Sequence, residues 1–304
     1  HRLFRRQRQM CIRDRSQALT KWMTNQKIEQ FSSKHENAFV GVWGIFGHGN
    51  VAGLGEALFD VKDKLPTFRG HNEQGMAHAA ISFAKQKKRR QMMAVTSSIG
   101  PGATNFLTAC ALAYVNRLPV LFLPGDVFAN RLPDPVLQQT ENFADATVSA
   151  NDCFKPISRF FDRITRPEQI IQSLPKAMSV LTDPADCGPV TLSLCQDVQS
   201  EAYNYPETFF EPKVWKIRRQ PCDFDELDNV IKKINSSKKP LIIVGGGVKY
   251  SGAKTELENL INSTGIPFAV TQAGKSSLDE TNSKFVGSIG CLLYTSPSPR
   301  DRIR

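Results

Sequence analysis

The chain has 304 residues, 40% of them hydrophobic and 22% charged, which is the composition of a globular protein long enough for about two domains. Its formal net charge of +10 lies mostly at the ends, because residues 1–16 hold six Arg and one Asp and residues 291–304 hold three Arg and one Asp. We therefore expect no nucleic-acid partner, and no membrane partner either, since no apolar run approaches the roughly 18 residues of a membrane span.

Seven cysteines are spread along the sequence without any Cys-x-x-Cys pair. This spacing supports neither a zinc site nor a disulfide framework, and it favours a reducing compartment. We therefore expect a cytoplasmic protein.

The two ends of the chain differ from the rest in pattern. Residues 1–16 show no apolar period and no feature of a signal peptide, and residues 291–304 break off a well-patterned segment abruptly. Both strings resemble translated sequencing-adapter read-through, and a disordered basic arm is the alternative. We expect them to be non-native tails around a natural protein at residues 17–290 that is truncated at its C-terminal end.

Between these ends, strand and helix patterns alternate. Residues 17–31 predict an amphipathic helix. The apolar run at 38–46 is typical of a strand buried on both faces of a parallel sheet, and a glycine-rich turn and a helix to residue 59 follow it. The further elements expected in this domain are strands at 64–69, 91–96, 119–123 and 189–194, and helices at 72–87, 103–114 and 167–181.

This order predicts an α/β domain at residues 17–205 with a doubly wound parallel sheet, which binds ligands at the carboxyl ends of its strands. Residues 206–223 contain three prolines and no clear period, which predicts a linker. A second, incomplete α/β domain is expected at 224–290. Its expected elements are helices at 224–234 and 255–263 and strands at 240–244 and 266–270.

Residue spacing weighs against three common kinds of site. Residues 96–100 have Thr where a Gly-x-Ser-x-Gly motif needs its first Gly, and His71 and His78 are seven apart, whereas a zincin needs a spacing of four. The turn at 47–52 fits the start of a dinucleotide fingerprint, but no carboxylate ends a second strand about 20 residues later. A non-catalytic nucleotide-binding module using this turn or that at 245–247 stays open as an alternative.

Glu73 lies at a loop-to-helix junction within RGHNEQGMAHAA, among small and apolar neighbours. One interpretation is a first-turn acid that the helix dipole stabilises. The other is a functional acid whose pKa is raised because the following helix, with Met76, Ala77 and Ala80, shields it from water. The pattern of residues alone leaves both open.

Three motifs in a fixed order connect the chain with a known family. RGHNEQGMAHAAISFAKQ, VTSSIGPGATN and PVLFLPGD resemble, in order and spacing, the pyrimidine-binding domain of thiamine-diphosphate enzymes of the acetolactate synthase type. PLIIVGGGVKYSGA resembles the start of that family's central domain. Within the family, GIFGHGN, DPVLQQ and TRPEQ are most similar to members that open the ring of a polyhydroxylated cyclic dione in myo-inositol breakdown.

The resemblance implies roles for particular residues. Glu73 corresponds to the glutamate that hydrogen-bonds the aminopyrimidine ring of thiamine diphosphate and activates the cofactor by sharing a proton, without being the nucleophile. Gly100, Pro101, Gly102 and Asn105 correspond to the loop that packs on this ring, where glycine allows the backbone to approach.

The resemblance also implies a reaction, the hydrolytic cleavage of a C–C bond in a small cyclic dione. The alternative is the reaction of an acetolactate synthase-like carboligase or lyase. Gln138 corresponds to a glutamine near the reacting centre. His48 and Asn50 fall where the family places residues near the substrate, and His48 is a candidate for moving protons.

The sequence departs from the family at one point. Family members hold the diphosphate and Mg²⁺ in a third, C-terminal domain through Gly-Asp-Gly followed by Asn-Asn, and neither motif occurs here. We therefore expect no metal ligands in this chain and no activity from it alone. The whole enzyme is expected to be a homodimer or tetramer with active sites at subunit interfaces.

Overall fold

The computed structural model describes residues 10–130, 132–133, 136–140, 142 and 144–290. They form two compact units that divide between Arg218 and Arg219, inside the predicted linker. Within the described residues, no helix is both long and apolar enough to cross a membrane.

A six-stranded sheet forms the centre of the first unit. Its strands run parallel in the order β5-β4-β6-β7-β9-β8. They are β4 (Phe39–Gly44), β5 (Thr67–Arg69), β6 (Met92–Ser97), β7 (Leu121–Asp126), β8 (Phe160–Ile164) and β9 (Val190–Cys195). Every residue of β6, β7 and β9 is buried, as expected of strands covered on both faces.

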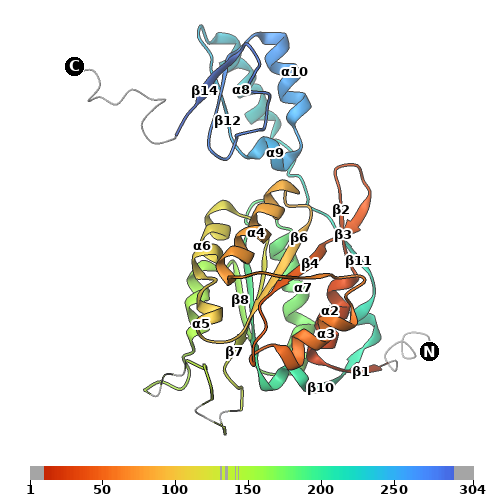
Figure 1. The fold of residues 1–304 in the computed structure, drawn as a ribbon. Coiled ribbons are helices and arrows are strands. Elements are labelled where there is room, and N and C mark those ends of the chain that lie inside the picture. The colour runs from red at the N-terminus through yellow and green to blue at the C-terminus, as the bar shows by residue number, and fades with distance from the viewer. Residues whose placement is uncertain (1–9, 131, 134–135, 141, 143, 291–304) are drawn as a thin grey trace, which may run out of the picture. The chain divides into compact units, whose positions relative to one another are not determined.

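Helices cover both faces of this sheet (Figure 1), which confirms the predicted doubly wound α/β class. On one face lie α4 (Glu73–Gln86), α5 (Pro101–Thr104) and α6 (Leu107–Asn116), and on the other α2 (Arg15–Thr24) and α7 (Ile170–Leu181). Leu19 and Trp22 of α2 share a buried core with Leu174 and Met178 of α7. Burying one such side chain stabilises the fold by about 1.5–3 kcal/mol, so this core fixes the strands whose ends carry the site.

The opening helix is shorter than predicted. It ends at Thr24, and β2 (Gln26–Glu29) follows in place of its expected last turn. β2 pairs with β3 (His35–Asn37) on one side and with β11 (Lys213–Trp215) on the other. Pairing with a strand so distant in sequence overrides the local helical pattern.

Residues 10–16 lie within the fold. β1 (Met10–Asp14) pairs antiparallel with β10 (Ala202–Pro206), and the Asp14 side chain caps α2 by accepting a hydrogen bond from the Gln17 N–H at 2.7 Å. The structural boundary therefore falls before residue 17, whereas the non-native origin of residues 1–16 stays a prediction.

The predicted linker carries regular structure that packs on the first unit. It contains η5 (Glu207–Phe210) and β11, and the Phe210 carbonyl accepts a hydrogen bond from Asn25 Nδ2 at 2.7 Å. No pattern in the sequence predicted β8, the edge strand of the sheet, which pairs with β9. β11 and β8 were missed because the strands with which they pair lie elsewhere in the chain.

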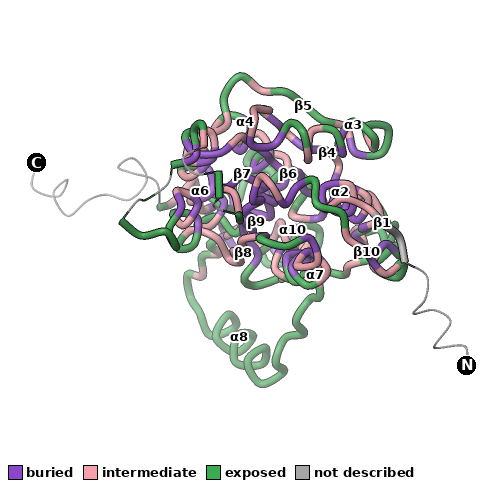
Figure 2. The backbone as a smooth tube through the Cα atoms, turned by 90° about the horizontal axis from the view of Figure 1, so that it is seen from below, coloured by how far each residue is buried: buried purple, intermediate pink, exposed green. Residues whose placement is uncertain are grey.

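The second unit is a smaller α/β structure. A three-stranded parallel sheet of β12 (Ile242–Val244), β13 (Phe268–Val270) and β14 (Phe285–Ser288) packs with α9 (Gly247–Ser251) and α10 (Lys254–Thr264). The helix α8 (Phe224–Ser236) precedes them and buries none of its residues (Figure 2). The expected helix and strand order of residues 224–270 is confirmed.

Candidate functional site

Three loops of the first unit meet at the carboxyl edge of its sheet, after β4, β6 and β7. A Cβ added at Gly49 would lie 2.6 Å from Cγ2 of Ile99, and one added at Gly125 would lie 2.8 Å from the same atom. These distances leave no room for a side chain, so glycine at both positions lets the loops close around Ile99. This edge is where α/β sheets bind ligands.

Glu73 is the first residue of α4 and faces the loop after β6. The helix is capped by Asn72, whose Oδ1 accepts a hydrogen bond from the Gly75 N–H at 2.9 Å. Oε2 of Glu73 accepts a hydrogen bond from Asn105 Nδ2 at 2.7 Å. In the described part of the chain, no donor bonds to Oε1. One carboxylate oxygen is therefore fixed, and the other is open to a ligand.

Glu73 is partly buried, so its own helix shields it in part, and its role as a functional acid stays a prediction. Met76, Ala77 and Ala80 are buried, but on the face of α4 that packs on the sheet. They form the inner face of the helix, and Glu73 lies at its first turn. Full desolvation of Glu73 needs a further surface on its open side.

The loop after β6 passes directly beside this carboxylate. A Cβ added at Gly102 would lie 3.4 Å from Glu73 Oε1. Pro101 is exposed and begins α5. Gly100 has a φ of +57°, and a Cβ there would lie 2.1 Å from the carbonyl oxygen of Gln138. Glycine is thus required at residue 100 both for the left-handed backbone and for the approach of Gln138.

His48 connects the turn after β4 with the loop after β7. Its Nε2 lies 2.5 Å from the Leu137 carbonyl oxygen, and its own carbonyl accepts a hydrogen bond from Gln196 Nε2 at 2.7 Å. Because a carbonyl oxygen can only accept a hydrogen bond, the contact with Leu137 requires a proton on Nε2. In the neutral ring, Nδ1 then carries no proton and can accept one.

Asn50 shapes the turn that carries His48. It is 1% exposed, and its Oδ1 accepts a hydrogen bond from the Gly47 N–H at 2.9 Å. Its Nδ2 donates to the Ile45 carbonyl at 3.2 Å and to Thr96 Oγ1 at 3.1 Å. Because both amide protons and the oxygen have partners in the protein, the structure gives Asn50 a positioning role, and its proximity to substrate stays a prediction.

The predicted residues fall into two groups. Glu73 lies with Gly102 and Asn105, while His48 and Gly100 lie against the loop that carries Gln138, whose side chain is exposed. A residue that sequence reasoning missed joins them. Ser98 Oγ accepts a hydrogen bond from the Gly49 N–H at 3.3 Å, and its Cβ lies 3.7 Å from a Cβ built at Gly102.

A buried polar network at the end of β7 was also missed. Asp126, 2% exposed, accepts hydrogen bonds from Arg163 Nε at 2.7 Å, Ser193 Oγ at 2.6 Å and Ser149 Oγ at 2.8 Å. Arg163 Nη2 donates to Asp152 Oδ1 at 2.7 Å. Such a network holds the end of β7 in one geometry. The Pro-Gly-Asp turn that closes this strand was the signal that could have marked it.

This network makes stability depend on pH. Burial raises the pKa of Asp152, but hydrogen bonds from the Ser149 N–H, Lys155 and Arg163 outweigh it, so the pKa lies below its usual range. A carboxyl with a depressed pKa stabilises the fold above its unfolded pKa of about 4, and this contribution is lost as the pH falls through the folded value. In urea titrations of this chain, we expect the free energy of unfolding to fall below about pH 4, and to fall less in Asp152→Asn. Identical pH dependence in both proteins would contradict this.

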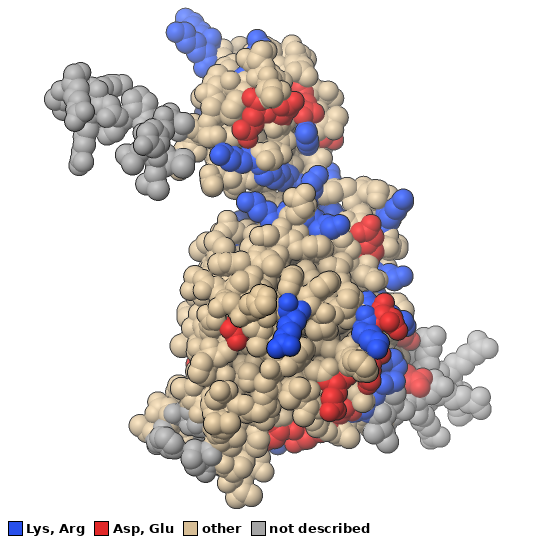
Figure 3. Space-filling model, viewed as in Figure 1, with Lys and Arg blue, Asp and Glu red and all other residues tan. Residues whose placement is uncertain are grey.

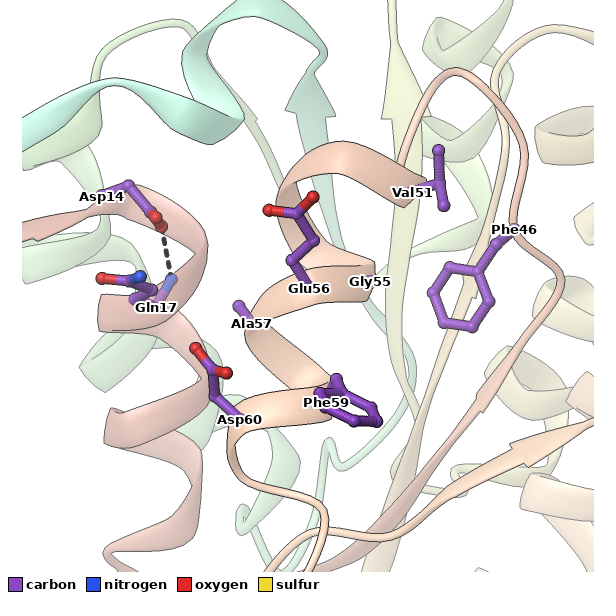
Figure 4. Close-up of a pocket in the computed structure, with 9 residues that line it drawn as sticks. All are labelled: Asp14, Gln17, Phe46, Val51, Gly55, Glu56, Ala57, Phe59 and Asp60. Atoms are coloured by element: carbon purple, nitrogen blue, oxygen red, sulfur yellow. Dashed lines mark hydrogen bonds between the residues drawn. The ribbon is translucent and has the colours of Figure 1, made fainter.

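A cavity of about 510 Å³ lies apart from these residues (Figure 4). It is lined by Asp14, Gln17, Phe46, Val51, Gly55, Glu56, Ala57, Phe59 and Asp60. None of the predicted site residues lines it. Over the described ranges, no group of three or more His, Cys, Asp or Glu residues is arranged to hold a metal ion.

Two family models match the sequence. Residues 34–146 match the N-terminal TPP binding domain of thiamine pyrophosphate enzymes, and residues 227–298 match the central domain of these enzymes. Thiamine pyrophosphate is another name for thiamine diphosphate. The first match contains every predicted site residue, from His48 to Gln138.

Curated relatives extend the match over most of the chain. Two proteins, from Geobacillus thermodenitrificans (50% identical) and Bacillus cereus strain ZK (48%), are named 3D-(3,5/4)-trihydroxycyclohexane-1,2-dione hydrolase, the second with the suffix 1. Each aligns over 275 residues, 90% of this chain, but only 43% and 42% of the relative's length. The chain thus spans less than half the length of the curated relatives it matches. It belongs to the thiamine pyrophosphate enzymes, with their N-terminal cofactor-binding domain followed by sequence of their central domain.

Proposed function

We propose that this chain is the pyrimidine-binding part of a thiamine-diphosphate-dependent enzyme that hydrolyses a C–C bond of trihydroxycyclohexane-1,2-dione and opens its ring in myo-inositol breakdown. The observation that carries the proposal is the Glu73 carboxylate, held through one oxygen by Asn105 and open at the other beside Gly102. The name shared by relatives that are about half identical to the chain supports the choice of substrate.

The residues around Glu73 suit the aminopyrimidine ring of thiamine diphosphate. Such a ring needs a carboxyl group that can share a proton with a ring nitrogen, and a backbone surface that it can approach closely. Oε1 of Glu73 meets the first requirement, and the backbone of Gly102, which has no side chain, meets the second. When bound, the cofactor supplies the carbon nucleophile and the electron sink for C–C cleavage.

Glu73 has the task of holding the proton that it shares with the ring. The hydrogen bond from Asn105 keeps Oε2 an acceptor and fixes the orientation of the carboxyl group, so the proton resides at Oε1. Closing the open side of Glu73 with another protein surface would exclude water from the shared proton.

His48 and Gln138 are proposed to act on the substrate. His48 Nδ1 is suited to moving a proton to or from a substrate oxygen or carbon, because Nε2 is engaged by Leu137. The exposed amide of Gln138 is suited to orienting hydroxyl groups of the cyclic dione. Asn50 is proposed to keep His48 in place through the turn.

The remaining half of the active site is proposed to come from another domain and another subunit. That domain would hold the diphosphate and Mg²⁺, and the enzyme would be a homo-oligomer without nucleic-acid or membrane partners. α5 and α6, which follow the loop beside Glu73, support this, because neither helix carries a charged residue (Figure 3) and Val115, near the far end of α6, is 72% exposed. An uncharged face with exposed apolar side chains suits an interface. A whole enzyme that sediments as a monomer would contradict the proposal.

A cytoplasmic location is proposed from the cysteines. Five of them are free thiols: Cys110, Cys153, Cys187, Cys195 and Cys222. Burial raises the pKa of the Cys110, Cys187 and Cys195 thiols to about 12, so they remain protonated and unreactive. Such thiols suit a reducing compartment.

Reading the gene beyond residue 304 tests the proposal at least cost. We expect the reading frame, once any adapter sequence is removed, to continue into a domain with Gly-Asp-Gly followed by Asn-Asn. A stop codon without such a domain would sink the proposal. An enzyme that joins two 2-oxo acids and leaves the cyclic dione unchanged would instead favour the acetolactate synthase-like alternative.

A further inference from the structure

The loop after β7 holds Gln138 in a conformation that side chains rarely adopt. Its φ is +62°, in the left-handed region. A residue other than glycine is disfavoured there, because its Cβ crowds the following carbonyl oxygen. Such outliers persist only where the surroundings over-determine them, and they concentrate at functional sites. The contacts that hold Gln138 are therefore informative.

Gln139, the residue after Gln138, and Gln196, the residue after β9, form a chain of side-chain amides across the carboxyl edge of the sheet. Gln139, 5% exposed, accepts a hydrogen bond from the Phe128 N–H through Oε1 at 3.2 Å. Its Nε2 donates to Gln196 Oε1 at 3.2 Å, and Gln196 Nε2 donates to the His48 carbonyl at 2.7 Å. We call this set the amide relay: Phe128 N–H, Gln139, Gln196 and the His48 carbonyl.

The chemistry of the relay explains why both members are glutamines. Each side chain must accept a hydrogen bond through its oxygen and donate one through its nitrogen, which only an amide can do without carrying charge. The relay joins three segments far apart in sequence: the loop after β7, through its residues Phe128 and Gln139, the residue after β9, and the turn after β4. Because Gln139 is buried, losing its partner would leave polar atoms unsatisfied.

We infer that Gln139 and Gln196 are positioning residues that hold the two substrate-side groups, the Gln138 amide and the His48 ring, in register with each other. Gln138 is adjacent to Gln139, and His48 supplies both the carbonyl at the end of the relay and the ring nitrogen that meets Leu137. The catalytic part of this inference rests on the proposed function. It assigns the relay to handling of the substrate and not to activation of the cofactor at Glu73.

The first test uses this chain and the exchange rate of the Phe128 amide proton, followed by NMR. Gln139→Met removes its acceptor, and we expect exchange to quicken about tenfold, since one lost hydrogen bond of this kind corresponds to about a tenfold change. Gln196→Met should quicken it as well, because Gln139 then loses its own partner. Gln91→Met is the matched control: Gln91 is buried and donates to the Asn37 carbonyl at 3.1 Å, outside the relay.

The second test uses the whole enzyme, with turnover of the cyclic dione and exchange of the cofactor C2 proton measured side by side. Gln139→Met and Gln196→Met should each lower kcat about tenfold and leave C2 exchange unchanged, whereas Gln91→Met should alter neither. Gln196→Glu retains an acceptor for Gln139 but cannot donate to His48, so it should preserve protection of Phe128 and still lose turnover.

The outcomes separate this inference from the proposed function. Unchanged Phe128 exchange in both Met variants, or a loss of C2 exchange equal to the loss of turnover, would overturn the inference. A wild-type enzyme with neither C2 exchange nor turnover would overturn the proposed function and with it the substrate-handling role, while the Phe128 result would still decide whether the relay holds the loop.

Discussion

Replacing Glu73 by Gln is expected to slow exchange of the cofactor C2 proton in the whole enzyme by at least about 100-fold, the usual contribution of a positioned proton-transfer group. Gln can fill the space of Glu73 and can still accept a hydrogen bond from Asn105 through its oxygen. It cannot hold and release the shared proton, so the loss should appear in C2 exchange before any substrate is added. The measurement is deuterium exchange at C2 by rapid quenching and NMR.

Glu56 provides the matched control for this experiment. It lies in the first turn of α3 (Glu56–Asp60), as Glu73 lies in the first turn of α4, and it is exposed. Glu56→Gln removes the same charge from a similar helix position and should leave C2 exchange unchanged. If Glu73→Gln behaved like Glu56→Gln, Glu73 would be only a first-turn acid that the helix dipole stabilises.

Replacing Gly102 by Val is expected to weaken thiamine diphosphate binding to the whole enzyme about 100-fold, because extra methyl groups in a close-fitting contact cost about 1–3 kcal/mol, whose upper end corresponds to about 100-fold. The first added carbon meets Glu73 Oε1 at 3.4 Å, an ordinary contact, so the fold should tolerate the change. The further methyl groups occupy the surface on which the aminopyrimidine ring is proposed to lie. Equilibrium titration with the cofactor gives the affinity, and urea unfolding gives the stability.

Gly75→Ala separates this effect from a general sensitivity to the loss of glycine. Gly75 lies in α4, two residues from Glu73, and only Asn72 atoms at 3.8 and 4.0 Å are near a Cβ there. Replacing a helical glycine by alanine stabilises a helix by up to about 1 kcal/mol, so this variant should bind the cofactor normally and unfold at a higher urea concentration. Equal affinity in Gly102→Val and the wild type would show that the ring does not lie beside Gly102.

The sequence predicted the elements whose signal is local. The helix with Glu73 has a capping Asn at residue 72 and apolar residues at helical spacing, and strands β6, β7 and β9 are rich in apolar residues and buried throughout. β2 and β11 could not be predicted in this way, because their pairing joins Gln26 with Lys213. The helical pattern of residues 17–31 is overridden at residues 26–29 by the pairing with β11, which forms only in the folded chain.

The candidate site shows the same limit. The turn and loop glycines could be placed on one sheet edge from strand order, but the contact that requires Gly100 is with the Gln138 carbonyl, across an irregular loop. Likewise the bonds from Arg163 to Asp126 and from Gln139 to Gln196 join residues that have no common motif. The sequence motifs mark the groups that meet a ligand, and the structure adds the residues that hold them.

The central claim is that this chain forms the pyrimidine half of a thiamine-dependent hydrolase for a cyclic dione. Its most direct test is an enzyme in which residues 17–290 replace the aligned segment of the Geobacillus thermodenitrificans relative, which is 50% identical over 275 residues. We predict that this enzyme opens the ring of trihydroxycyclohexane-1,2-dione, that it needs added thiamine diphosphate to do so, and that Glu73→Gln abolishes the reaction. A folded chimera that binds the cofactor but leaves the dione intact, or that opens the ring equally well with Gln at residue 73, would contradict the claim.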